Sequence, residues 1–161
     1  MESEIVIRLM KEADKPEILR MMRVFYDSPA VQHTTPDEIL EKDIDDCLSD
    51  MPYLKGFVIE KENQIAGYAM TAISYTTEYG GICIWLEDLY LKPEYRHSGI
   101  AGKVFRFIEN YYPDAVRFKL EVEPENEFAV KAYQKYSYQI SPYFLMTKEM
   151  EQPHEKVKNT D

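Results

Sequence analysis

The run W-L-E-D-L-Y-L-K-P-E-Y-R-H-S-G-I-A, residues 85–101, decides how this chain folds. Its first part belongs to an apolar, β-prone stretch at 82–91, and a turn marked by Pro93 follows. From Gly99 onward, apolar residues recur at helical spacing as far as about residue 112. The pattern therefore predicts a buried strand that leads through a short loop into a helix, with a glycine at the junction.

The junction has the chemistry of an anion-binding site. The first N–H groups of a helix lack partners inside the helix, and the helix dipole makes that end positive. Because glycine lets an anion approach the backbone closely, a strand, a glycine loop and a helix start together predict a phosphate site. We expect Arg96 to add a charge-assisted contact. The backbone N–H groups that we expect to form the site are those of His97, Ser98, Gly99, Ile100, Ala101 and Gly102.

Two motifs in the chain resemble those of a known family. Residues 96–101, R-H-S-G-I-A, fit the R/Q-x-x-G-x-G/A signature of the GNAT N-acetyltransferases. The preceding L-E-D-L-Y-L-K-P-E-Y looks like the strand before that signature, most of all in the polyamine and small-amine acetyltransferases. Residues 126–133, N-E-F-A-V-K-A-Y, resemble the second motif of the family, N-x-x-A-x-x-x-Y. The resemblance covers residues 5 to about 150 and implies that acetyl-CoA places its pyrophosphate on the helix N-terminus.

The composition is typical of a soluble globular domain. At 161 residues, with 45% hydrophobic and 30% charged residues, we expect one domain over 1–150 and a flexible tail over 151–161. The sequence has no apolar run near the ~20 residues of a membrane span, and its first residues do not resemble a signal peptide. Cys47 and Cys83 lack metal-ligand spacing. These features predict reduced core thiols, no metal, no membrane partner and a cytoplasmic location.

The net charge of −10 leaves two interpretations open. It argues against a nucleic-acid partner, because binding phosphates requires a basic surface. It suits a cationic partner, since an acidic field raises the local concentration of amines. Alternatively, the acidity serves solubility alone.

Periodicity elsewhere predicts the order β-α-α-β-β-β-α-β-α-β-β. Short polar turns favour antiparallel neighbours, and the strand–helix–strand unit around 99–112 favours a parallel pair. By resemblance, we expect an α/β (α+β) single-domain GNAT fold. Its mixed, mostly antiparallel sheet would be splayed between the fourth and fifth strands and flanked by four helices. Strands are predicted at 5–9, 56–60, 65–74, 82–91, 115–123, 138–140 and 143–150; helices are predicted at 14–24, 35–51, 99–112 and from 124, the first two with side-chain caps at Asp14 and Thr35.

The resemblance assigns the residues that hold the acyl carrier and protonate its thiolate. It implies that Leu89, Tyr90 and Leu91 offer backbone contacts to the pantetheine arm, and that the N–H near Leu89 faces the acetyl carbonyl. It also implies that Asn126 contacts pantetheine and that Tyr133 lies by the sulfur. Their seven-residue spacing puts both on one helix face. The alternative is that Tyr133 is simply a buried aromatic residue.

Glu87 and Asp88 are the candidates for removing the proton of the amine. Regular alternation along a strand would point them to opposite faces, so we do not expect a paired dyad. An acid inside an apolar strand is costly unless it is paired or hydrated, which favours a role for at least one of them. The resemblance favours Glu87 as the base, acting through water. Purely structural hydrogen bonding by both acids remains the alternative.

The leading interpretation is an acetyl-CoA-dependent N-acetyltransferase that acts directly on a primary amine of a small, possibly cationic and polyamine-like acceptor. A protein or peptide N-acetyltransferase and a catalytically silent acyl-CoA-binding module remain open alternatives. The resemblance also makes a homodimer possible. One departure from the family is Tyr136-Ser137-Tyr138, where members often have a glycine, so the last helix must end without its favoured residue.

Overall fold

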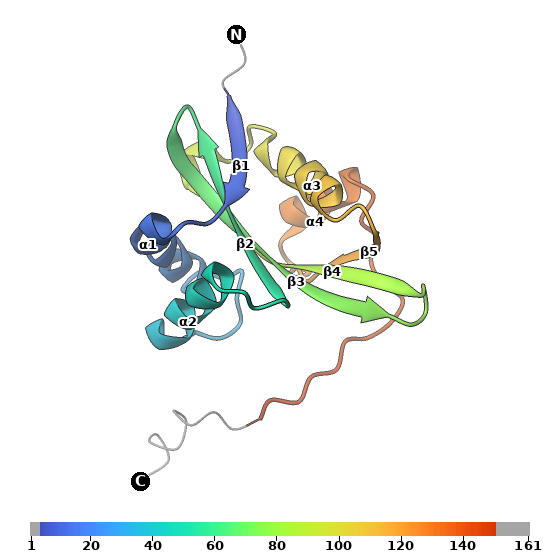
Figure 1. Ribbon diagram of the computed structural model, residues 1–161. Helices are drawn as coiled ribbons and strands as arrows, with labels where there is room; N and C mark the ends of the chain where they lie inside the picture. Colours follow the sequence, from blue (N-terminus) through green and yellow to red (C-terminus); the bar gives the residue numbers. More distant parts are fainter. Residues whose placement is uncertain (1–3, 151–161) are drawn as a thin grey trace.

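Residues 4–150 are described by a computed structural model, in which five strands form one mixed sheet with two helices on each face (Figure 1). The strands lie in chain order across the sheet: β1 Ile5–Leu9, β2 Leu54–Lys61, β3 Gln64–Thr76, β4 Gly81–Leu91 and β5 Ala115–Leu120. The helices are α1 Lys15–Tyr26, α2 Asp37–Leu48, α3 Ile100–Tyr111 and α4 Glu127–Lys135. Two 3-10 turns, Glu12–Asp14 and Pro93–Tyr95, lead into α1 and α3.

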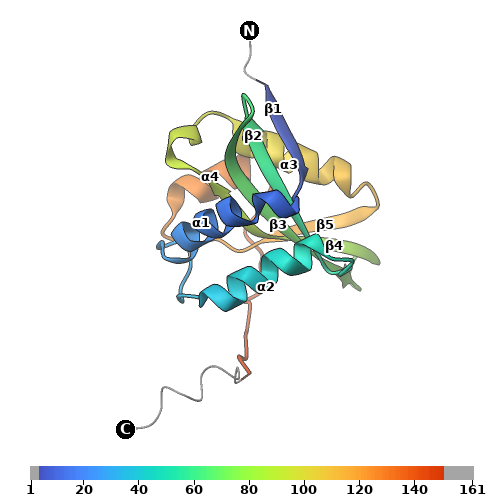
Figure 2. The same ribbon diagram turned by 60° about the vertical axis from the view of Figure 1, so that its left-hand side comes forward.

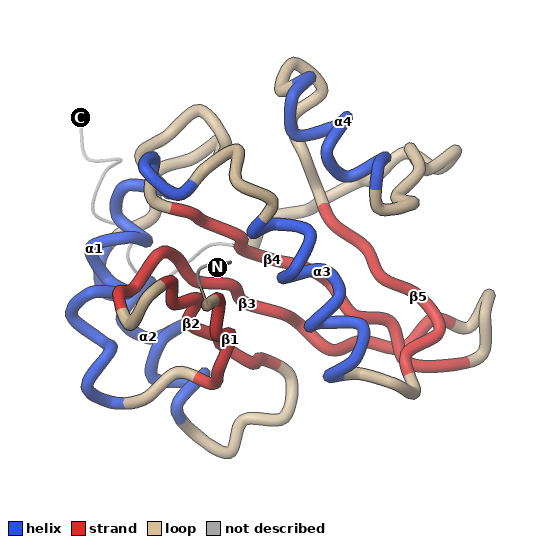
Figure 3. The backbone as a smooth tube through the Cα atoms, turned by 90° about the horizontal axis from the view of Figure 1, so that it is seen from above, coloured by secondary structure: helices blue, strands red, loops and turns tan. Residues whose placement is uncertain are grey.

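The two faces of the sheet carry separate cores. Helices α1 and α2 cover one face and α3 and α4 the other, which is clearest when the molecule is turned or seen from above (Figures 2 and 3). Under α1 and α2 the buried residues include Ile18, Leu40 and Tyr68. Under α3 they include Ile84 and Val104. The sheet is therefore covered on both faces, and the apolar stripes predicted for these helices are confirmed.

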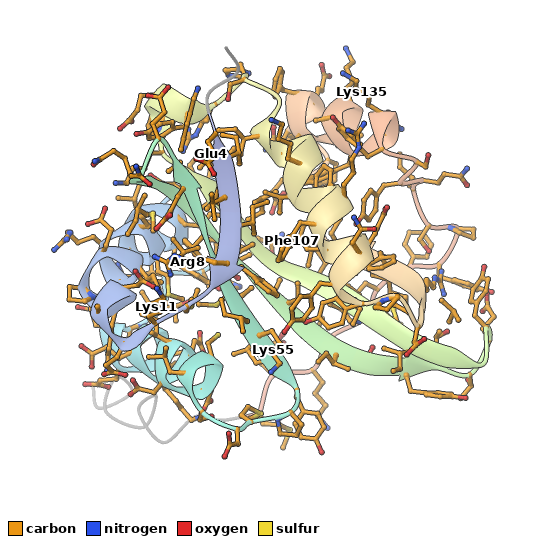
Figure 4. The ribbon with its side chains drawn as sticks, turned by 45° about the horizontal axis from the view of Figure 1, so that its top comes forward. Glu4, Arg8, Lys11, Lys55, Phe107 and Lys135 are labelled. Carbon is orange, nitrogen blue, oxygen red and sulfur yellow. The ribbon has the colours of Figure 1, made fainter. Side chains whose placement is uncertain are left out.

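Helix α3 is fixed to the sheet by aromatic contacts. Phe107 lies on the side of α3 that faces the sheet (Figure 4), with its ring centroid 5.3 Å from that of Phe57 in β2. Tyr111, one turn further on, packs 5.0 Å from the same ring. Edge-to-face contacts of this kind favour one orientation of the helix. The orientation of α3 sets where its N-terminus points.

Strand pairing follows the predicted pattern. Strands β1 to β4 are antiparallel neighbours, and β4 and β5 are parallel. Glu62 and Asn63 form the β2–β3 turn with φ of 51° and 63°, as expected of a two-residue hairpin loop. The mixed sheet and the four helices of the expected fold are confirmed.

A β-bulge interrupts β4 at the two acids. Leu86 pairs with Thr71 and Asp88 pairs with Met70, so Glu87 is an extra residue in the ladder. Leu86 packs in the core under α3, whereas Asp88 accepts a hydrogen bond from Tyr68 in the core under α1 and α2. In a regular strand, positions two apart share a face. The bulge therefore reverses the alternation at this point.

The predicted closing strands at 138–140 and 143–150 are wrong. After α4 the chain is extended as far as residue 150 but pairs with no strand among residues 4–150. The stretch is rich in apolar residues, but a strand requires a partner ladder as well as a suitable composition. The predicted tail at 151–161 lies outside the described residues.

The two predicted side-chain caps are also wrong. Asp14 accepts hydrogen bonds from the Arg8 guanidinium at 2.7 and 2.9 Å and from the backbone N–H of Lys11, so it closes the turn before α1. Figure 4 shows Arg8 and Lys11 at this junction of β1 and α1. Pro36 is the N-cap of α2, and no side chain caps that helix. The carboxylate that local spacing assigned to a cap instead forms an ion pair with Arg8, six residues earlier in the chain.

Helix α4 ends with a residue in the left-handed region, a position that glycine usually occupies. Ser137 adopts a φ of 73°, in the left-handed region, directly after the C-cap Tyr136. The backbone N–H of Tyr138 then bonds to the carbonyl of Tyr133 at 3.1 Å. The chain therefore forms the usual helix ending but places a side chain where one is disfavoured.

Candidate active site

The site begins where β4 and β5 separate. Their parallel pairing runs only from Ile82 with Ala115 to Leu86 with Leu120, where β5 ends. Strand β4 continues to Leu91 and is bonded there to β3 alone. Among residues 4–150, no strand pairs with the β5-facing edge of 87–91. This splay leaves a row of backbone groups available to a ligand that lies alongside β4.

The N-terminus of α3 lies just beyond the open edge. Gly99 is its N-cap with a φ of 82°, a conformation that side chains rarely adopt. No side chain caps the helix, and a Cβ added at Gly99 would meet nothing within 4 Å. Open space and uncapped N–H groups are what an anion cradle requires, so these residues fit a pyrophosphate.

Arg96 holds the loop to the end of β4. Its Nε donates to the carbonyl of Leu91 at 2.8 Å, and its guanidinium lies 5.5 Å from the centroid of the Tyr90 ring. His97, with a φ of 61°, packs its ring edge-on against Phe128 of α4, with centroids 4.4 Å apart. These contacts order the loop, and a contact between Arg96 and phosphate remains a prediction.

Gly102 is needed for packing in the first turns of α3. A Cβ at this position would lie 1.8 Å from the hydroxyl oxygen of Tyr136. The missing side chain therefore lets the end of α4 press against the start of α3. Contribution of the Gly102 N–H to the anion site stays a prediction, whereas its role in packing follows from the close approach of Tyr136.

Tyr133 lies on α4 among aromatic rings, with centroids 5.5 Å from Phe105 and 5.9 Å from Tyr138. Burial raises the pKa of its hydroxyl. Among residues 4–150, no hydrogen bond engages that hydroxyl. The side-chain oxygen of Asn126 accepts from the N–H of Ala129 at 3.2 Å and so caps α4. The raised pKa keeps the Tyr133 hydroxyl protonated at neutral pH, and donation of that proton to a thiolate stays a prediction.

The two acids of β4 have different surroundings. Asp88 is 3% exposed and accepts hydrogen bonds from the hydroxyls of Tyr26 at 2.9 Å and Tyr68 at 2.8 Å. Burial raises its pKa to about 6, against the effect of those hydrogen bonds, and the negative charges of Asp43 and Glu87 add to the rise. Glu87 is exposed, and its position beside the splay leaves its carboxylate open to a ligand.

Glu87 and Asp88 are not isolated from each other. Solvent reaches Glu87, but the protein around its carboxylate still displaces enough water to raise its pKa, and the charges of Glu121 and Asp43 raise it further. Asp43 therefore acts on both acids of β4, and Glu87 acts on Asp88. The bulge breaks the regular alternation on which the expectation of opposite faces depended, but the two acids still differ in their surroundings, because Asp88 is buried and Glu87 is exposed.

The sequence analysis missed Asp43, Tyr26 and Tyr68. Asp43 is half-buried on α2, and burial raises its pKa to about 6. Its spacing was a usable signal, because it follows Leu40 by three residues and precedes Cys47 by four, on the edge of the apolar stripe. Two other acids on α2 are held in ion pairs at the surface, namely Asp45 with Lys15 at 2.7 Å and Asp46 with Lys42 at 2.6 Å.

A hydrogen bond joins the α1–α2 loop to the segment between β5 and α4. Gln32, in the loop between α1 and α2, donates to a carboxylate oxygen of Glu123, in the loop before α4, at 3.0 Å. These residues are 91 positions apart in the chain. The bond therefore links segments that belong to the helices on the two faces of the sheet.

Comparison with known proteins decides the family. Residues 17–138 match the Acetyltransferase (GNAT) family. The chain belongs to the GNAT acetyltransferase family. It is therefore an acyltransferase, and the acyl donor of such acetyltransferases is acetyl-CoA. The resemblance drawn from residues 96–101 and 126–133 is confirmed at the level of the family.

Two curated relatives and one solved structure illustrate the match. The thialysine N-epsilon-acetyltransferase of Sus scrofa is 31% identical over 143 residues, which cover 81% of this chain and 82% of that protein. A putative ribosomal protein bS18-alanine N-acetyltransferase of Bacillus subtilis is 27% identical over 146 residues, covering 86% and 83%. An aminoglycoside N-acetyltransferase in complex with CoA superposes with a TM-score of 0.76 at 16% identity, covering 92% of this chain and 97% of that chain.

Two further features of the described part of the chain bear on partners. Within residues 4–150, no helix has the length and apolar character needed to cross a membrane. The same residues hold no group of three or more histidine, cysteine or acidic side chains arranged to bind a metal ion.

Proposed function

We propose that this GNAT enzyme transfers the acetyl group of acetyl-CoA directly to a primary amine of a small, cationic acceptor. The observation that carries the proposal is the open edge of β4, which ends at the uncapped N-terminus of α3 and has carboxylates beside it. The thialysine acetyltransferase of Sus scrofa, a relative whose named acceptor is a small amine, supports this acceptor class.

The open edge of β4 and the N-terminus of α3 would each bind a different part of acetyl-CoA. Pantetheine is a chain of amides, and it can extend along the unpaired backbone of Leu89, Tyr90 and Leu91 as an added strand would. Its pyrophosphate would then meet the N–H groups around Gly99. The N–H near Leu89 would donate to the acetyl oxygen as that atom gains negative charge.

Glu87 and Tyr133 would carry the two proton transfers. The amine lone pair attacks the acetyl carbon, and its proton passes to Glu87 through water. The C–S bond then breaks, and the departing thiolate takes a proton from the Tyr133 hydroxyl. The raised pKa of Tyr133 keeps that proton in place until the thiolate forms. The raised pKa of Glu87 makes it a stronger base than an ordinary carboxylate.

Negative charge around the splay favours a cationic acceptor. Asp43, Asp88 and Glu121 come from α2, β4 and the end of β5, and Asp43 and Glu121 both act on Glu87. A second ammonium of the acceptor would relieve this mutual repulsion. Such a cation would favour the ionised form of Glu87, which is the form needed to accept a proton.

A second candidate is acetylation of a protein or peptide amine. The Bacillus subtilis relative, whose named acceptor is an alanine of a ribosomal protein, supports it. The two candidates differ in what must enter the splay, because a peptide needs room for a following chain. A small diamine needs only carboxylates for its second charge.

An assay of thiol release from acetyl-CoA tests the proposal. The acceptor panel should contain thialysine, a polyamine, an aminoglycoside and a peptide that begins with alanine. We expect the highest kcat/KM with a small diamine, and turnover with the peptide alone would favour the second candidate. Binding of acetyl-CoA without turnover on any acceptor would indicate a silent module.

Two variants and one control separate chemistry from folding. Glu87→Gln should lose most turnover while still binding acetyl-CoA, because the amide cannot accept the proton. Glu41→Gln, on the exposed face of α2, serves as the matched control and should keep full activity. Equal activity of both variants would overturn the assignment of Glu87 as the base.

A further inference from the structure

Two tyrosine hydroxyls converge on the buried acid of β4. Each carboxylate oxygen of Asp88 accepts one hydrogen bond: Oδ1 from the hydroxyl of Tyr26 at 2.9 Å and Oδ2 from the hydroxyl of Tyr68 at 2.8 Å. Tyr26 is the last residue of α1, and Tyr68 comes from β3, the strand beside β4. Three separate elements therefore meet at one carboxylate. We call these three residues the Asp88 clamp.

The two rings of the Asp88 clamp are held by their neighbours. The Tyr68 ring is fully buried, and its centroid lies 6.1 Å from that of Tyr90, its pairing partner in β4. The Tyr26 ring packs edge-to-face on Phe25, with centroids 5.1 Å apart, and the Phe25 ring lies 6.4 Å from that of Tyr90. Tyr68 reaches Asp88 because diagonal neighbours in an antiparallel pair are within reach of an aromatic side chain. Packing therefore places both hydroxyls beside the carboxylate.

Both tyrosines of the Asp88 clamp remain hydrogen-bond donors at neutral pH. Burial raises the pKa of Tyr26 and of Tyr68, and the negative charge of Asp88 raises both further. A hydrogen bond from a hydroxyl to a charged carboxylate is stronger than one between neutral groups. Removing either donor would leave a buried oxygen of Asp88 unsatisfied, which is costly. The clamp therefore links β4 firmly to β3 and to the end of α1.

The direction of Glu87 depends on its two neighbours in the chain. Glu87 is the extra residue of the bulge and lies between Leu86 and Asp88. Leu86 is held by packing in the core under α3, whereas Asp88 is held by the two tyrosine hydroxyls on the other face of the sheet. The residues that follow, 88–91, are fixed by their ladder with β3. Because a bulged residue lacks the paired contacts that orient the rest of a strand, Glu87 is the residue most sensitive to how Asp88 is held.

We propose that Tyr26 and Tyr68 are positioning residues for acetyl transfer: their hydrogen bonds to Asp88 hold the bulge and thereby aim the carboxylate of Glu87 at the acceptor amine. Each tyrosine would act through Asp88 and the backbone of β4, without touching the reacting atoms. The inference rests on the proposed role of Glu87 as the base. A misplacement of about 1 Å in a catalytic group can cost about 100-fold in rate. Loss of a tyrosine hydroxyl would therefore lower kcat, while the ladder with β3 would keep 89–91 in place for acetyl-CoA.

Deleting one hydroxyl at a time in the full chain tests the Asp88 clamp. Tyr26→Phe and Tyr68→Phe keep the rings and remove the donors. With the acceptor that has the highest kcat/KM in the panel, we expect kcat to fall at least about 10-fold in each variant, and the acetyl-CoA dissociation constant to stay within about 3-fold of native. Tyr143→Phe is the matched control and should keep the native kcat, because the Tyr143 hydroxyl also donates to a carboxylate, that of Glu78 in the β3–β4 turn, at 3.2 Å. A native kcat in both clamp variants would overturn the inference.

A double-mutant cycle separates the aiming of Glu87 from a general loss of stability. If the tyrosines act through Glu87, Tyr68→Phe should not lower kcat further once Glu87→Gln is present. A general weakening of the fold would instead lower kcat by the same factor in the native and the Glu87→Gln backgrounds. Thermal unfolding of each variant verifies that it is folded at the assay temperature. Equal factors in the two backgrounds would overturn the inference.

Motion of Glu87 separates a failure of this inference from a failure of the proposed base. NMR relaxation dispersion of the Glu87 backbone amide requires no turnover, and it reports exchange on the microsecond-to-millisecond timescale. We expect exchange in Tyr68→Phe and a flat profile in the native protein and Tyr143→Phe. A flat profile in Tyr68→Phe, together with a slow Glu87→Gln, would overturn the inference alone. Exchange with a native kcat would overturn the proposed base as well, because a mobile Glu87 would then have no effect on the rate.

Discussion

Replacing Asp88 with asparagine tests the buried carboxylate at the centre of the site. Its pKa in the fold is about 6, against an ordinary 3.8, because burial disfavours the charged form more than Tyr26 and Tyr68 stabilise it. The folded state therefore binds the proton more tightly than the unfolded state does. This group contributes stability below pH 3.8 that is lost as the pH rises to about 6.

The magnitude follows from the size of the shift. A difference of about two pKa units corresponds to about 3 kcal/mol between the two limits, and to about 1.4 kcal/mol between pH 5 and pH 8. Asparagine has nearly the shape of the protonated acid, and a tyrosine hydroxyl can accept from its amide. Asp88→Asn should therefore be more stable than the native protein at pH 8, by an amount that shrinks toward pH 5.

Urea unfolding followed by the fluorescence of Trp85, the single tryptophan, gives the measurement. The free energy of unfolding should be compared at pH 5, 6, 7 and 8 for the native protein, Asp88→Asn and a control, Asp50→Asn, which is exposed at the end of α2. The control should follow the native curve. An Asp88→Asn curve parallel to the native one over this range would refute the assignment of a costly buried charge to Asp88.

Four further predictions address the site and its frame. Tyr133→Phe should lower kcat by about 10–100-fold with little change in the acetyl-CoA KM, because only proton donation is lost. Tyr53→Phe, at an exposed tyrosine, is the control. Equal kcat values for the two variants would contradict the role of Tyr133 as proton donor. Glu87→Gln should remove the fall in rate at low pH, since no carboxylate remains to be protonated; a native pH profile would contradict the base. Gly99→Asp should weaken acetyl-CoA binding, measured by calorimetry, at least about 10-fold relative to the control Gly99→Asn. Both side chains tolerate a positive φ, but only aspartate carries a charge that repels the pyrophosphate. Ser137→Gly should raise the free energy of unfolding by about 0.5–1 kcal/mol, because glycine adopts the φ of 73° without strain, and unchanged thermal unfolding would argue against that strain.

Local sequence patterns predicted the central strand, turn and helix of the molecule. The apolar stretch at 82–91, the turn at Pro93 and the helix after Gly99 all appear where the sequence placed them. Each depends on residues a few positions apart, so periodicity and turn residues suffice to define it. The family followed from two motifs of the same local kind.

Features that depend on the path of the chain in space were not predicted from local patterns. Asp14 has the spacing of a helix cap, but it pairs with Arg8, six residues earlier, because the turn after β1 brings the guanidinium beside it. Asp88 meets Tyr26, 62 positions away, only because α1 packs across the sheet. Strands were predicted at 138–140 and 143–150, but pairing is decided by whether an edge is within reach.

The sequence by itself determined the strand–turn–helix unit, the apolar faces of the helices and the two motifs that identify the family, because all of these are periodic or local. Only the tertiary structure decided which acid of β4 is buried. The bulge adds one residue to the strand, so every later side chain points to the opposite face, and no sequence pattern predicted the bulge. It also brought Asp43 to the site, because the field at a carboxylate is set by charges that the fold gathers from separate elements.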